Sequence, residues 1–110
     1  MSEEKKIEKI NHYAQKGNLK KLSHFCDSED SELRCACAAA LGSMGTEEAR
    51  NMLISMINDP DLATKKAVVT SLGKIGDKGS TEYIRHAMEH SSDDGFMALC
   101  RDTIHQLMKA

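Results

Sequence analysis

Two histidines four residues apart offer the most direct candidate chemistry in the chain. They lie in the string His86-Ala87-Met88-Glu89-His90, which has the form HxxEH. On a helix both imidazoles would share one face, where they could bind zinc. A zinc site also needs a third ligand and an enclosing cleft, and Ala87 and Met88 have the character of core residues. We therefore predict no metal site and no cofactor, with His86 and His90 as the alternative zinc ligands.

The cysteines suggest a second kind of chemistry. They are Cys26, Cys35, Cys37 and Cys100. Cys35 and Cys37 are two residues apart, so on a helix they would point about 200° apart and could not form a metal or redox pair. The segment MSEEKKIEKI is charged and lacks the apolar core of a signal peptide, which favours a cytoplasmic location. We therefore expect four reduced thiols, with Cys35 and Cys37 buried.

Composition and charge argue against several classes of function. The 110 residues fit one domain, and a net charge of -2 argues against a nucleic-acid partner, because such domains usually carry a basic excess. No apolar run approaches the roughly 20 residues needed to cross a bilayer. The sequence contains neither a phosphate-binding glycine loop nor a serine in a nucleophile turn. It therefore offers little support for catalysis.

An internal repeat supplies the elements that would position these residues. When the chain is shifted so that Leu41 falls on Leu72, the string ALGSMG falls on SLGKIG and Leu53 falls on Ile84. We call this alignment the repeat register. The C-terminal segment follows it only when extra residues are allowed around HSSDDG. We predict a single domain over 1–110, with repeats at about 1–28, 29–59 and 60–92 and a partial repeat at 93–110.

Each repeat has the pattern of two helices. Apolar residues recur at helical spacing, and Gly45 and Gly76 end the first helices. Asp59 is expected to be the N-cap of the third repeat's first helix, with Pro60 at the first helical position. Seven helices are predicted, at about 3–15, 18–26, 29–44, 47–58, 60–75, 79–90 and 95–108. No single helix can bury its apolar side alone, so neighbouring repeats must stack.

The units DSEDSELRCACAAALGSMG and NDPDLATKKAVVTSLGKIG resemble the short HEAT-like repeats of phycobilisome lyase subunits. Both have an acidic turn, a basic residue early in the first helix, small residues and a Leu-Gly step. The resemblance implies an all-α fold, a right-handed α-α superhelix of about three helix pairs plus a terminal helix, like an armadillo solenoid. It places first helices on the convex side and second helices on the concave side. It does not imply lyase activity, because such repeats occur in many scaffolds.

Two features predict how the first helices behave. Asp30 lies four residues before Arg34, and Asp61 four residues before Lys65, so we expect an ion pair within each helix. The run from Cys35 to Ala40 contains only cysteine and alanine, and such small side chains let helix axes approach closely. We therefore expect close packing between repeats along this layer.

The second helices carry the main candidate for a binding site. In the repeat register, three rows of side chains lie away from the apolar stripe and would form a ridged surface on the concave face. The rows are Lys20, Asn51 and Glu82; Ser23, Ile54 and Arg85; and His24, Ser55 and His86. We predict that these rows bind another protein, although any amphipathic helix also presents such residues to solvent.

The last expected helix has no second helix after it. Terminal repeats normally present a polar outer face, yet this helix contains Phe96, Met97 and Met108. We expect these three to stay partly open, which would favour a homodimer or a docked partner. The alternative is that the helix simply closes the stack.

These patterns predict a non-enzymatic protein–protein interaction module or adaptor. The partner is another protein, with no membrane and no cofactor involved. The alternative is a metal-dependent hydrolase or a tetrapyrrole (bilin) lyase-like component, which would need bound metal or bilin.

Overall fold

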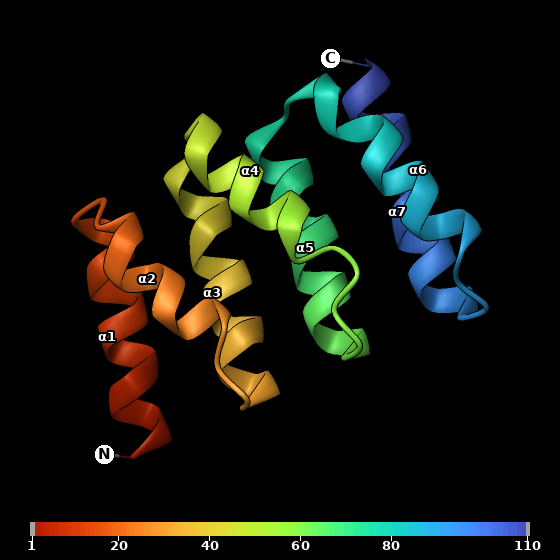
Figure 1. Cartoon of the computed structure of the whole chain (residues 1–110). Helices are drawn as coiled ribbons and strands as arrows, with labels where there is room; N and C mark the ends of the chain where they lie inside the picture. The colour runs from red at the N-terminus through yellow and green to blue at the C-terminus, as the bar shows by residue number, and fades with distance from the viewer. Residues whose placement is uncertain (1, 110) are drawn as a thin grey trace.

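The computed structural model describes residues 2–109, which form helices and no strand (Figure 1). The α-helices are α1 (Glu3–Gln15), α2 (Leu19–Cys26), α3 (Ser31–Met44), α4 (Glu47–Ser55), α5 (Leu62–Ile75), α6 (Thr81–Glu89) and α7 (Asp94–Lys109), and a 3-10 turn, η1 (Lys78–Ser80), precedes α6. The predicted all-α class and helix order are confirmed. Within residues 2–109, no helix has both the length and the apolar content that a bilayer crossing requires.

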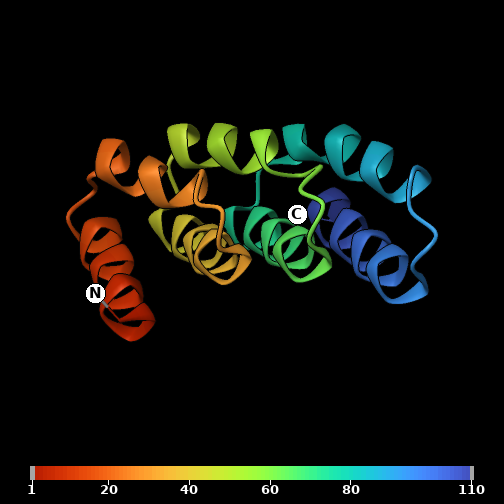
Figure 2. The ribbon, with the colours of Figure 1, turned by 60° about the horizontal axis from the view of Figure 1, so that its bottom comes forward.

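The helices lie in two layers, which Figure 2 shows from the side. The first helices of the repeats, α1, α3, α5 and α7, form one layer, and the second helices, α2, α4 and α6, form the other. Along the first layer α1 packs on α3, α3 on α5 and α5 on α7, and the α3–α5 contact is the most extensive. The second helices contact one another far less. The fold is therefore a short helical solenoid whose repeats are joined mainly through the first layer.

The core fills the space between the two layers. Leu22, Leu53 and Ile84 enter it from the second helices, and Leu41 and Leu72 from the first, and all five are completely buried. Burying one such side chain contributes about 1.5–3 kcal/mol relative to leaving it exposed. Because successive members of each set are separated by one repeat length, the repeat detected in the sequence is a repeat of core positions.

Each junction between repeats is built from the same pair of hydrogen bonds. A side-chain oxygen accepts from the backbone N–H of an aspartate two residues later, and that aspartate accepts an N–H from the first turn of the next helix. The pairs are Ser28 with Asp30, Asp59 with Asp61, and Ser91 with Asp93. The third pair comes one position later than the repeat register predicts, and this single insertion is why the C-terminal segment falls out of register.

These caps overturn two expectations. Asp61, not Asp59, caps α5, so Pro60 lies before the helix rather than in its first turn. The ion pairs expected within α3 and α5 are also wrong, because the carboxylates of Asp30 and Asp61 turn toward the N–H groups of the first helical turn. Arg34 instead contacts Asp59, and the Lys65 ammonium lies 5.1 Å from the centre of the Phe96 ring.

The α3–α5 contact depends on one glycine. A Cβ placed on Gly42 would lie 2.4 Å from Ser71 Oγ and 3.0 Å from Ser71 Cα, so the α5 backbone itself fills the space. The Ser71 hydroxyl is buried and donates to the carbonyl of Ala38 across the same contact, at 2.7 Å. At the next junction a Cβ on Gly73 would meet only side-chain atoms, the methyl group of Thr103 at 3.1 Å and Gln106 Oε1 at 3.9 Å. The close approach predicted from small residues therefore occurs at α3–α5, with glycine as its tightest point.

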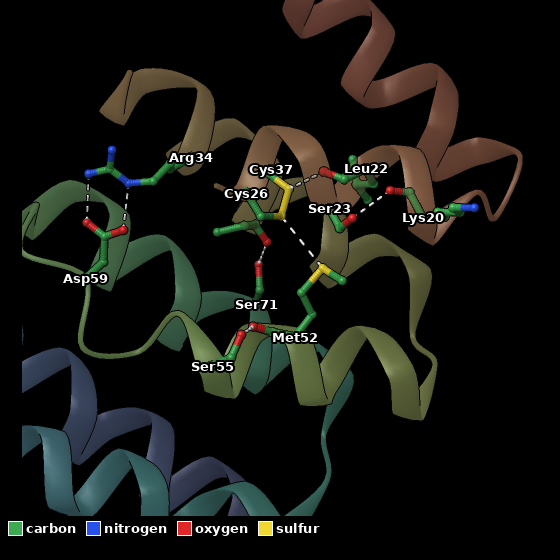
Figure 3. Close-up of a disulfide and its surroundings, with 11 residues drawn as sticks. Lys20, Leu22, Ser23, Cys26, Arg34, Cys37, Met52, Ser55, Asp59 and Ser71 are labelled. Carbon is green, nitrogen blue, oxygen red and sulfur yellow. Dashed lines mark hydrogen bonds and ion pairs between the residues drawn. A yellow bond between two sulfur atoms is a disulfide. The ribbon is translucent and has the colours of Figure 1, made fainter. Parts of the chain in front are cut away.

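The cysteines do not all follow the prediction. Cys26 at the end of α2 and Cys37 in α3 form a disulfide bond, with Cα atoms 5.6 Å apart (Figure 3). The expectation of reduced thiols was therefore wrong for this pair, whose members lie on different helices. Cys35 and Cys100 are free; Cys35 is only partly buried, whereas Cys100 is buried.

The terminal helix closes the stack more completely than expected. Phe96 is fully buried, which corrects the prediction that it stays open, because its ring packs beneath Lys65 and its N–H is held by Asp93. Met97 is half-buried and Met108 is 59% exposed. Arg101 is exposed at the position where the preceding helix places the buried Val69. A polar side chain on the outer side of α7 thus replaces the apolar one on α5.

The two inter-repeat glycines give a matched pair of substitutions. Alanine normally stabilises a helix interior by about 1 kcal/mol over glycine. We expect Gly42→Ala to reverse this, lowering the free energy of unfolding by about 2 kcal/mol, because the added methyl forces the α5 backbone away. Gly73→Ala should change it by less than about 1 kcal/mol, since the Thr103 methyl can move. Denaturant unfolding of both variants measures this, and equal losses would contradict the steric explanation.

Candidate functional site

The nine residues predicted to bind a partner all lie on the second-helix face, the outer surface of α2, α4 and α6, and none is buried. The exposed ones are Lys20, His24, Asn51, Ser55, Glu82 and His86, and those partly buried are Ser23, Ile54 and Arg85. Because the second helices make few contacts with one another, the face is divided by grooves rather than sealed. Two of these grooves bring predicted residues together.

The first groove lies between α4 and α6 and has a volume of about 520 Å³. Its lining is Ile54, Ser55, Ile57 and Asn58 from one repeat and Glu82, Tyr83 and His86 from the next. Ser55 and His86, which are one repeat apart in the sequence, therefore do border the same space. Glu82 is paired with Arg85 one turn along α6, so its charge is already partly compensated. The groove offers an apolar floor with a polar rim.

Tyr83, with Ile57 and Asn58, is one of three residues lining this groove that the sequence did not predict as site residues. The helical spacing of Tyr83 and Ala87 predicts a core position for both, but the Tyr83 side chain is 50% exposed. A signal was available in the repeat register, which aligns Tyr83 with the exposed Lys21 of the first repeat and the half-buried Met52 of the second. A position occupied by lysine, methionine and tyrosine is at the edge of the core rather than within it.

The second groove lies between α2 and α4 and has a volume of about 440 Å³. Ser23 and Ser55 line it, together with Cys26, Met52 and Met56. Each serine hydroxyl donates to a carbonyl three residues earlier in its own helix, at 2.6 Å, as Figure 3 shows. The groove is therefore mixed in character, with the sulfur atoms of Cys26, Met52 and Met56 beside the charged side chains of Asp27, Arg34 and Asp59.

An ion pair between two repeats borders this second groove. Arg34 Nε and Nη2 donate to the two carboxylate oxygens of Asp59, at 2.7 and 3.0 Å (Figure 3). Its Nη1 donates to the carbonyls of Ser28 and Glu29. The Asp59 side chain is only 9% exposed. Hydrogen bonds from Arg34 hold the pKa of Asp59 below its usual value. The guanidinium thus joins the loop before α3 to the loop before α5.

The residues of the HxxEH string do not form a metal centre in the part of the chain that is described. The rings of His86 and His90 lie 4.2 Å apart between centroids, and His90 Nδ1 is 2.9 Å from the His86 carbonyl. Among residues 2–109 no group of three histidine, cysteine or acidic side chains is arranged to hold a metal ion. His86 lies instead in the α4–α6 groove, whereas His90 follows the end of α6.

Comparison with protein families agrees with this geometry. A family model for HEAT repeats matches residues 19–100, from the start of α2 into α7. The chain belongs to the HEAT-repeat family. No curated protein and no solved structure matches it significantly. Membership of this family explains the two-layer stack but does not identify a partner. The candidate binding site therefore rests on the two grooves.

The Arg34–Asp59 pair predicts a specific response to acid. Because the pKa of Asp59 is lowered in the fold, its stabilising effect is present above about pH 4 and is lost as the pH falls through the lowered pKa. We expect Asp59→Asn to lower the Tm by roughly 5–10 °C at pH 7. The difference from the parent protein should shrink as the pH drops below about 4.

Thermal melts across this pH range measure the effect. Asp102→Asn is the matched control, because Asp102 is exposed on α7. A difference between parent and Asp59→Asn that stays constant down to pH 2 would show that the pair is not responsible.

Proposed function

We propose that the protein is a non-enzymatic interaction module that binds another protein through its second-helix face. HEAT repeats generally serve protein–protein interaction, and extended faces of stacked helices are the surfaces such solenoids use. The face is defined here by its helices, α2, α4 and α6. Similarity to other HEAT stacks would make it the concave side.

The α4–α6 groove is the observation that carries this proposal. It combines partly buried Ile54 with Tyr83, one of the few large hydrophobic side chains that remain exposed. Tyrosine is enriched among the residues that dominate binding energy, particularly when it borders an apolar pocket with a polar rim. Glu82 and His86 supply such a rim. A helix or extended segment that inserts one apolar side chain beside Tyr83 is the partner this shape fits.

The enzymatic alternatives have less support. A metal-dependent hydrolase would need a third ligand beside His86 and His90, and the described residues supply none in position. The resemblance to phycobilisome lyase subunits concerns the repeat itself, so a tetrapyrrole lyase-like role rests on analogy of fold alone. Homodimerisation through α7 has also lost one of its three expected contacts, since Phe96 is buried.

Substitutions on the face test the proposal once a partner has been captured by crosslinking in cells. We expect Tyr83→Ala to weaken binding at least about tenfold, because it removes the apolar anchor. The combined variant His24→Ala, Arg85→Ala and His86→Ala should weaken it further. Titration calorimetry with the purified partner measures both.

The control for this experiment is a variant of the outer side of α7. Arg101 and His105 are exposed, and neither lines a second-helix groove. Arg101→Ala with His105→Ala should bind as the parent does. Unchanged affinity after the Tyr83 and triple substitutions, with helical circular dichroism intact, would remove the second-helix face as the binding site.

A further inference from the structure

The disulfide lies at a junction, or joint, between two repeats, and the next joint along the chain is filled by apolar residues instead. Cys26 ends the second helix of one repeat and Cys37 lies in the first helix of the next. In the repeat register the corresponding residues at the following joint are Ile57 and Val68, which are 5% and 0% exposed. An ordinary pair of hydrocarbon side chains therefore suffices to close this joint. The covalent bond is an addition at one place, not a requirement of the fold.

Each sulfur atom of the pair has an acceptor within reach if the bond is reduced and the sulfur atoms move apart. Cys37 Sγ lies 3.5 Å from the Leu22 carbonyl oxygen, and Cys26 Sγ lies 3.7 Å from Met52 Sδ (Figure 3). Each of these acceptor atoms can accept a weak hydrogen bond from an S–H group. Reduction would thus leave two small, buried side chains with partners for their hydrogens. Such a joint can exist in two states without loss of the core.

Only one of the two bonded cysteines borders a groove. Cys37 is fully buried, whereas Cys26 is 8% exposed and lines the α2–α4 groove. A small thiol that enters this groove meets Cys26 Sγ and not Cys37 Sγ. The remaining cysteines are poor competitors, because burial raises the pKa of both, that of Cys100 to about 11. Cys35 Sγ is directed to the carbonyl of Ala63 on α5, away from the bond.

We propose that Cys26 and Cys37 form a reversible redox lock that fastens α2 to α3. A small thiolate attacks Cys26 Sγ, the S–S bond breaks, and Cys37 leaves as a thiolate that takes up a proton. A second small thiol attacks the mixed disulfide, releasing the small-molecule disulfide and the Cys26 thiol. Overall, one protein disulfide and two small thiols give two protein thiols and one small disulfide. Oxidation is the reverse reaction, with glutathione disulfide as oxidant.

The lock acts on the second-helix face. Cys26 and Met52 belong to opposite sides of the α2–α4 groove, so release of α2 from α3 frees one wall of that groove. Control of recognition through this groove rests on the proposed function. The reversible disulfide does not rest on that function. It would remain valid even if Tyr83→Ala left partner binding unchanged.

The experiment equilibrates the full chain in glutathione buffers from reducing to oxidising. Acid quenching, alkylation and mass spectrometry then count free thiols, and hydrogen exchange reports on each helix. We expect four thiols at the reducing end and two, Cys35 and Cys100, at the oxidising end, with the helical circular dichroism unchanged. Closing a loop of this size should lower the equilibrium constant for opening of α2 about a hundredfold. Amides of α2 should therefore exchange faster after reduction, whereas those of α6 and α7 should not respond.

A matched variant copies the next joint into this one. Cys26→Ile with Cys37→Val reproduces the Ile57 and Val68 pair, so the variant should fold. The hydrogen exchange of its α2 amides should be the same in every glutathione buffer. The proposal is overturned if the parent keeps the same thiol count in every buffer, if reduction unfolds it, or if its α2 exchange is equal in the two states.

Discussion

The contact between α3 and α5 is the constraint on which the rest of the structure depends. The Gly42 backbone packs directly against Ser71, and the buried Ser71 hydroxyl is satisfied by a carbonyl of the opposite helix. Backbones approach this closely only where no Cβ intervenes, so small residues decide how near two repeats lie. The size of the side chains between neighbouring helices explains both the tight first layer and the looser second layer. Helices that meet through glycine and alanine draw together, while α2, α4 and α6 carry larger polar side chains and remain apart.

Grooves on the second-helix face follow from this difference in spacing. A solenoid buries its core between layers, so the outer surface of the second layer is free to vary from repeat to repeat. Its three rows differ at every step, as Lys20, Asn51 and Glu82 illustrate. The first-layer junctions, in contrast, keep the same aspartate cap three times. The first layer, which holds the stack together, is therefore regular from repeat to repeat. The second layer, which we propose recognises a partner, varies from repeat to repeat.

Much of this fold could be predicted from the sequence because it is encoded locally. Period, capping aspartates and terminal glycines each act within a few residues, and they place helix ends to within a few residues of the observed ones. The partners of long side chains were not predictable in the same way. Arg34 could reach Asp30 on its own helix, but that carboxylate caps α3, so the guanidinium bonds to Asp59 in the next loop. An ion pair between repeats depends on the distance between those repeats, and a local sequence pattern does not give that distance.

The candidate site shows the same division. Exposure of the three rows followed from helical periodicity, and the repeat register placed Tyr83 at the edge of the core. That Tyr83 lines a groove, however, required knowledge of the gap between α4 and α6. The disulfide is the extreme case, because Cys26 and Cys37 lie on different helices and only their packing makes them neighbours. Comparison between joints then gives what neither sequence nor geometry gives alone. Ile57 and Val68 close one joint between repeats, and Cys26 and Cys37 close the preceding one. Both pairs fill the core, so the two cysteines are distinguished by their chemistry and not by their packing. That chemistry is placed where the α2–α4 groove opens to solvent.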